Sequence, residues 1–64
     1  MKVNVYSDGE QLVEDAQVPE DQRFNVGDVI VVNGDDYTIL DSKSSIDEEG
    51  VNVVEVQVKH AARV

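Results

Sequence analysis

The stretch Val26–Leu40, VGDVIVVNGDDYTIL, consists of two apolar runs joined at Asn33-Gly34. Both residues of an Asn-Gly pair readily take the positive φ angles of a type I′ turn, whose twist matches that of the flanking strands. The stretch therefore predicts a β-hairpin with strands over Val29–Val32 and Tyr37–Leu40. Because Val29–Val32 is apolar at every position, it is typical of a central or strongly curved strand.

The segment before this hairpin has two possible structures. Lys2–Tyr6 alternates in the manner of a strand, and Asp8-Gly9 provides a second tight turn into a strand over Gln11–Val18. Pro19 ends that strand, because proline cannot donate to a sheet ladder. The region also fits a short helix, with a capping box at Ser7-Asp8-Gly9-Glu10 and helical spacing of Leu12, Val13 and Ala16.

The second half of the chain predicts a long loop and a last strand. Asp41–Gly50 is polar, and we expect it to be the most mobile part of the molecule. In Val51–Lys59 the valines change parity at Val53-Val54, which indicates either a β-bulge or burial on both faces at that point. Phe24 is the only Phe and is expected to anchor the core.

These segments together predict an all-β fold, a small SH3-like barrel of about five antiparallel strands with little or no helix, in a single domain over residues 1–64. The 64 residues include no Cys, so an apolar core has to hold the fold without disulfides. The longest apolar run, Val29–Val32, is far shorter than the roughly 20 residues of a membrane helix. Met1–Val5 lacks the layout of a signal peptide, and a cytoplasmic location is expected.

Two local sequences resemble known families. Phe24–Val31, FNVGDVIV, resembles the opening of SH3-like small barrels, including the KOW modules of ribosomal and transcription-elongation proteins. The resemblance implies a small barrel, although the Lys/Arg-rich loops of the RNA-binding members are missing here. Val32–Leu40, VNGDDYTIL, is similar to a hairpin of the ring-forming co-chaperonins, but the chain is shorter than that fold and has no apolar mobile loop.

The chain is strongly acidic, since five Lys and Arg against 14 Asp and Glu give a net charge of −9. Free nucleic acid is a poor partner for such a surface, because binding to phosphates requires Lys and Arg. Three explanations of the acidity compete. The carboxylates keep the surface soluble, or they are an adaptation to a high-salt cell, or they imitate DNA.

No motif indicates catalysis, a metal or a cofactor. His60 is the only His and lacks a partner for proton transfer, and the hydroxyl residues have no triad signature. Asp47-Glu48-Glu49, with Asp41, could collect a hard cation, but the spacing differs from that of an EF-hand. Asp35-Asp36 is explained equally well as turn chemistry. We therefore expect a protein without enzymatic activity.

The leading functional hypothesis is a monomeric interaction module that binds another protein through an exposed sheet edge or the Asp41–Gly50 loop. Candidate partner-binding residues are Tyr6, Tyr37, Ile46, Asp47, Glu48 and Glu49, with ordinary packing as the alternative for the apolar ones. The basic segment Lys59–Val64 could dock on an acidic surface. Two further hypotheses are a ribosome- or RNA-associated accessory protein of a halophilic organism and an acidic inhibitor that imitates DNA.

Overall fold

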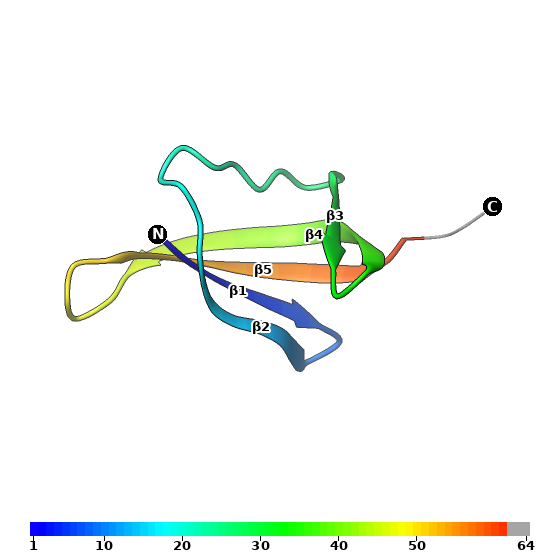
Figure 1. Ribbon diagram of the computed structural model, residues 1–64, viewed down its shortest axis with the longest axis horizontal. Helices are drawn as coiled ribbons and strands as arrows, with labels where there is room; N and C mark the ends of the chain where they lie inside the picture. The colour runs from blue at the N-terminus through cyan, green and yellow to red at the C-terminus, as the bar shows by residue number, and fades with distance from the viewer. Residues whose placement is uncertain (62–64) are drawn as a thin grey trace.

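Residues 1–61, which the computed structural model describes, form a curled mixed sheet with the shape of a half-barrel (Figure 1). The order across the sheet is β2-β1-β5-β4-β3, and residues 1–61 contain no helix. The predicted all-β, barrel-like fold is therefore confirmed. The strands are β1 (Lys2–Ser7), β2 (Glu10–Gln17), β3 (Val29–Val32), β4 (Asp35–Ile46) and β5 (Asn52–His60).

One pairing departs from the predicted antiparallel arrangement, because β1 and β5 run parallel at the centre of the sheet. Tight turns join β1 to β2, β3 to β4 and β4 to β5, and these pairs are antiparallel. No short connection joins β1 to β5, since the three other strands lie between them in the sequence. Their relative direction is therefore free of the constraint that a hairpin imposes.

Both predicted dipeptide turns are present. Asn33 and Gly34 have φ angles of 51° and 84° and join β3 to β4. Asp8 and Gly9 have φ angles of 49° and 82° and join β1 to β2. The helical alternative for Ser7–Ala16 is wrong, because the Asp-Gly turn directs the chain back along β1 as a strand.

The prediction of a loop over Asp41–Gly50 is wrong for its first six residues. β4 continues to Ile46, and each residue of Asp41–Ile46 has a partner on β5. Backbone groups form this ladder regardless of side-chain polarity, and β5 supplies the valines that hold the pair in the sheet. The connection between β4 and β5 is therefore a short turn that starts at Asp47.

The register shift of this hairpin lies in β4, so of the two alternatives for Val53-Val54 the β-bulge in β5 is wrong. The β4–β5 ladder is irregular between Ile39 and Asp41, where Gly27 N–H also donates to the Ile39 carbonyl at 2.8 Å. Val53 and Val54 instead pair in regular register with both β1 and β4. Val54 is buried and Val53 is half-buried, so burial on both faces explains their change of parity.

The core lies on one face of the sheet and is built largely from valine. Segment 18–28, which we call the covering segment, crosses over the sheet between β2 and β3 (Figure 1), and Phe24 packs against the core from it, as expected. The buried apolar residues are Val3, Val5, Val32, Tyr37, Ile39, Val54, Val56 and Val58. Alternation places polar side chains on the outer face, including Lys43, Glu55 and Gln57.

β3 is an edge strand, so the central position, one of the two alternatives predicted for Val29–Val32, is wrong. Ile30 and Val32 face the core, whereas Val29 and Val31 are 57% and 68% exposed. A four-residue apolar run does not distinguish burial on both faces from burial on one, because strand order depends on pairing with distant segments.

The opposite edge of the sheet, β2, is irregular and is held in place by a buried polar side chain. Asn4 is 8% exposed, and its Oδ1 accepts hydrogen bonds from Asp15 N–H at 2.8 Å and from Gln11 Nε2 at 3.1 Å. Asp15 has a φ angle of 49°, and the β1–β2 register shifts twice. These contacts fix β2 in a bulged shape that differs from a flat edge.

Candidate functional site

The two tyrosines predicted to bind a partner differ in exposure. Tyr37 is 6% exposed, and its ring lies against His60 with the ring centroids 4.4 Å apart. Ordinary packing therefore accounts for Tyr37, which does not present its ring at the surface. Tyr6 is half-buried on the outer face of β1, where its hydroxyl accepts a 3.5 Å hydrogen bond from Gln11 Nε2.

The other predicted residues gather at the turn between β4 and β5. Ile46 is 70% exposed, and Glu48 and Glu49 are exposed. Tyr6 lies opposite Gln57 and Ile46 opposite Asn52, so about five residues of β5, or roughly 17 Å, separate them. The fold therefore does not bring the six candidates together into one surface.

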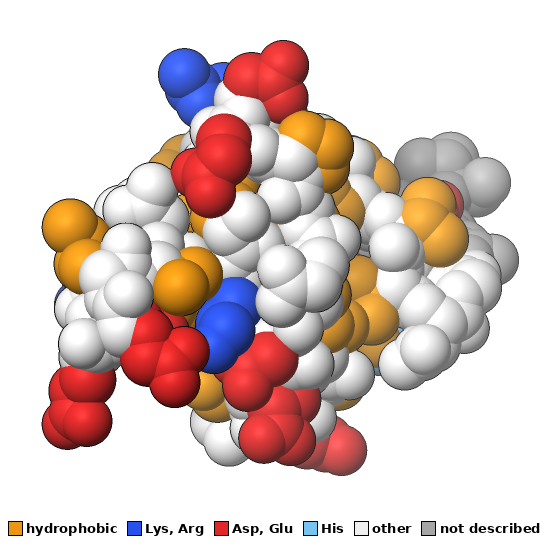
Figure 2. Space-filling model, turned by 60° about the vertical axis from the view of Figure 1, so that its left-hand side comes forward, with side chains coloured by type: hydrophobic (Ala, Val, Ile, Leu, Met, Phe, Trp, Pro, Cys, Tyr) orange, Lys and Arg blue, Asp and Glu red, His pale blue; other side chains and the backbone are white. Residues whose placement is uncertain are grey.

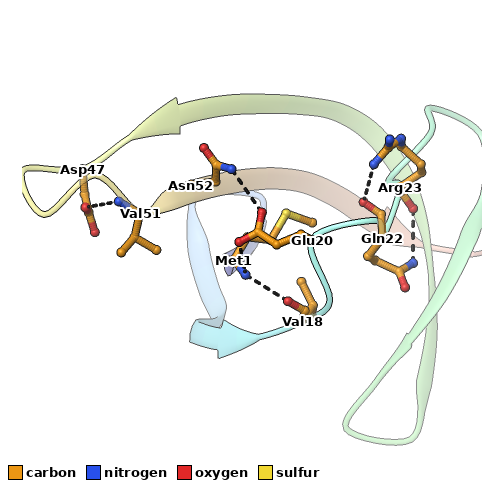
Figure 3. Close-up of polar contacts among 8 residues, drawn as sticks. All are labelled: Met1, Val18, Glu20, Gln22, Arg23, Asp47, Val51 and Asn52. Carbon is orange, nitrogen blue, oxygen red and sulfur yellow. Dashed lines mark hydrogen bonds and ion pairs between the residues drawn. The ribbon is translucent and has the colours of Figure 1, made fainter.

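Asp47 has a structural role that its sequence context did not reveal. Its Oδ1 accepts hydrogen bonds from the backbone N–H groups of Glu49 and Val51, both at 2.9 Å, and Figure 3 shows the one from Val51. Lys2 Nζ lies 3.4 Å from Oδ2. The hydrogen bond from Val51 is the main cause that lowers the pKa of Asp47, followed by those from Glu49 and Lys2. The Asp47 carboxylate therefore stabilises the turn between β4 and β5 in which it lies.

A second carboxylate, that of Glu20, connects the covering segment to the sheet (Figure 3). Asn52 Nδ2 donates to its Oε2 at 3.1 Å, and the Met1 amino group lies 3.2 Å from its Oε1. The Met1 amino group also donates to the Val18 carbonyl at 2.9 Å. The hydrogen bonds from Asn52 and the amino group lower the pKa of Glu20.

These two lowered pKa values predict a loss of stability in acid. A group with a lowered folded pKa contributes stability above its unfolded pKa and loses it as pH falls through the folded pKa. Taking 4.5 for Glu20 and 3.8 for Asp47 as the ordinary values, we expect urea midpoints to be constant from pH 7 to about 5 and to fall below about 4.

Asp47→Asn tests this assignment. The variant keeps a carbonyl oxygen for the turn but loses the charge, so its urea midpoint is expected below that of the parent chain at pH 7. The gap should close as pH falls through the lowered pKa of Asp47. Glu49→Gln is the control, because the Glu49 carboxylate has no hydrogen-bond or ion-pair partner in residues 1–61. An equal effect of both substitutions would contradict the assignment.

A groove of about 290 Å³ lies between the covering segment and the inner face of β4 and β5. Arg23 lies in it without an ion pair in residues 1–61, and its guanidinium donates a 3.5 Å hydrogen bond to the Gln22 carbonyl (Figure 3). Among the described residues that line it, no side chain is a carboxylate, His or Cys. The lining residues are Gln22, Arg23, Phe24, Asn25, Ser42, Ser44 and Val54.

Metal ligands do not converge in the described part of the chain. Among residues 1–61, no three His, Asp or Glu side chains could hold a metal ion together. Asp41, the predicted fourth member of the acidic cluster, lies in β4 opposite Gln57, and its Oδ1 accepts from the Ser42 N–H at 2.9 Å. Asp47 and Asp41 each have a local backbone partner instead.

The Lys and Arg side chains of residues 1–61 do not form a continuous basic patch. Lys43 lies opposite Glu55, and Lys2 lies beside Asp47. Figure 2 shows acidic side chains spread over the visible face, with the Lys and Arg side chains at separate places. Arg63 lies outside the described residues. The RNA-associated alternative therefore gains no support from the positions of Lys2, Arg23, Lys43 and Lys59.

The open edge of β3 was not predicted from the sequence. Residues that flank a two-residue turn form a hydrogen-bonded pair, here Val32 and Asp35, and pairs along an antiparallel ladder alternate. Ile30 therefore bonds to β4, whereas the N–H and C=O groups of Val29 and Val31 face away from it. The missed signal was the length of this strand, since four residues are typical of an edge.

Comparison with known proteins finds no matching family model, no matching curated protein and no matching solved structure. The resemblance to SH3-like and KOW modules therefore stays a prediction. Residues 1–61 also contain no helical segment that could span a membrane.

Proposed function

We propose that this chain binds another protein by accepting an extended segment of the partner as a further strand beside β3. The observation that supports this proposal is the exposure of Val29 and Val31, 57% and 68%, on a strand that has a neighbour on one side. An open edge offers unpaired backbone donors and acceptors in register for a partner strand.

The two edges of the sheet are not equivalent, and this favours β3 over β2. β2 carries Glu10, Glu14 and Asp15, and its double register shift bends the edge. Charged side chains and bulges are the devices that protect edge strands from pairing. β3 has neither, since its four residues are Val29, Ile30, Val31 and Val32 in regular register with β4.

Backbone pairing alone does not hold a partner on so short a strand. Two outward residues supply four hydrogen bonds of about 0.5–1.5 kcal/mol each, against roughly 4–15 kcal/mol of lost freedom on association. Side chains must supply the difference. The exposed Val29 and Val31 can bury apolar area against the added strand, at about 25 cal/mol per Å².

Two substitutions of Val31 separate backbone pairing from side-chain contact. Val31→Pro removes the outward N–H, and an outward position on an edge strand is one where proline is tolerated in a sheet. Val31→Thr is the control, because it keeps the N–H and the β-branched shape. We expect the Thr variant to retain a partner from extracts of the source organism and the Pro variant to lose at least about tenfold in recovery.

The fold of both variants is checked by urea denaturation, and their midpoints should match that of the parent chain. Equal recovery of the partner by the Pro and Thr variants would show that β3 is not the binding edge. Loss of the partner in both would show that the Val31 side chain, rather than the backbone, carries the interaction.

A further inference from the structure

We infer that the partner strand carries Lys or Arg at both ends and apolar residues between them; this inference rests on the proposed function and specifies its ligand. The basis is charge complementarity. Gly27–Thr38, which contains β3 and its turn, has three Asp and no Lys or Arg. Within this stretch the valines that would meet the partner are thus flanked by Asp only, and the nearest described Lys in the ladder, Lys59, lies two strands away on β5, opposite Thr38.

The three carboxylates lie at the two ends of the open edge. Asp28 immediately precedes β3, and its carbonyl accepts from the Ile39 N–H at 2.9 Å, which holds it beside the start of the strand. At the other end, Asp35 lies opposite Val32, and Asp36 lies opposite Val31. A partner strand is one strand spacing further out, about 10 Å from β4, so its long basic side chains could reach these carboxylates.

A second copy of this chain is a poorer fit to the same edge. Pairing β3 with β3 of another copy would bring two sets of the same three Asp together, on bodies that each carry a net charge of −9. Like charges facing each other across an interface oppose association. The edge therefore favours a cationic strand over its own copy.

The test uses three capped peptides that differ only at their ends: acetyl-Lys-Val-Thr-Val-Lys-amide and its counterparts with Gln or Glu in place of Lys. Their dissociation constants are measured by titration of the isotope-labelled chain, with the backbone amide signals of Val29 and Val31 as the readout. At about 0.01 M salt, where the Debye length is about 30 Å, we expect the Lys peptide to bind at least about tenfold more tightly than the Glu peptide. Near 1 M salt, where this length is about 3 Å, the ratio should fall below about threefold.

Two double variants of equal net charge locate the responsible carboxylates. Asp28→Asn with Asp36→Asn is expected to reduce the preference for the Lys peptide to about threefold or less at low salt. Glu48→Gln with Glu49→Gln removes the same two charges from the turn at the far end of β4, and should leave the preference within about twofold of the parent value. This turn lies far from the β3 edge. Tyr37, near that edge, lies opposite His60, and Ile46, beside the turn, lies opposite Asn52. His60 and Asn52 are eight residues, or about 27 Å, apart on β5.

Each outcome has a distinct meaning. Equal binding of the three peptides would overturn the inference about charge and leave strand addition intact. Binding of none would overturn both this inference and the function on which it rests. A chain that sediments as a dimer through β3 at low salt would show that a second copy occupies the edge, and would overturn the cationic partner.

Discussion

Replacing Ile39 by Ala is expected to lower the free energy of unfolding by about 2–5 kcal/mol. Ile39 is 1% exposed and lies in β4 at the centre of the core, so truncation removes buried contacts and leaves a cavity. A chain of 64 residues has roughly 3–10 kcal/mol of stability in total. The loss is thus a large part of the whole, and urea denaturation followed by circular dichroism measures it.

The matched control is Ile46→Ala, the same substitution in the same strand. Ile46 is 70% exposed, and its truncation should change the free energy of unfolding by no more than about 0.5 kcal/mol. Comparable losses from the two substitutions would mean that β4 does not present Ile39 and Ile46 to different surroundings. The half-barrel described above would then be incorrect.

Val56→Asp is expected to prevent folding at neutral pH. Val56 is 0% exposed and lies in β5, the strand between β1 and β4. Among residues 1–61 no Lys or Arg is buried, so an ionised carboxylate at this position would be desolvated without a cation from these residues beside it. The cost of several kcal/mol per buried ion matches or exceeds the stability of the chain. Circular dichroism at pH 7 should show the loss of the sheet signal.

Gln57→Asp introduces the same charge at the next residue of β5, where the side chain is exposed on the outer face. This variant should stay folded, with a urea midpoint near that of the parent chain. A folded Val56→Asp variant, or an unfolded Gln57→Asp variant, would contradict the assignment of the two faces of β5.

The local features of the fold were predictable because they depend on neighbouring residues. Asn33-Gly34 and Asp8-Gly9 take positive φ angles at low energetic cost. Each pair therefore favours a hairpin through its local sequence alone. Val3 and Val5 of β1 and Val54, Val56 and Val58 of β5 likewise follow the period of two that a half-buried strand requires.

Features that depend on distant pairing were not predictable in the same way. The place of β3 at the edge and the parallel β1–β5 pair depend on strand order, which the apolar composition of Val29–Val32 does not indicate. Asp41–Ser45 looked like a loop because its side chains are polar, although its backbone pairs with β5.

The candidate site was harder to predict than the fold. Tyr6 and Tyr37 both lie in strands, yet Tyr6 is one residue out of phase with the buried Val5 and lies on the outer face, whereas Tyr37 is in phase with the buried Ile39 and lies in the core. Asp47 was predicted as one of a row of acidic partner-binding residues, but its carboxylate accepts hydrogen bonds from the backbone of its own turn. Val29–Val32 was predicted to be a central or strongly curved strand because all four residues are apolar.

The measurement that tests the open β3 edge most directly is backbone amide hydrogen exchange, residue by residue, with and without the Lys-flanked peptide. In the free chain, the amides of Val29 and Val31 should exchange rapidly while those of Ile30 and Val32 are protected by β4. Saturation with the peptide should protect Val29 and Val31. Protection of these two amides in the free monomer, or their continued rapid exchange in the saturated complex, would contradict binding by strand addition at β3.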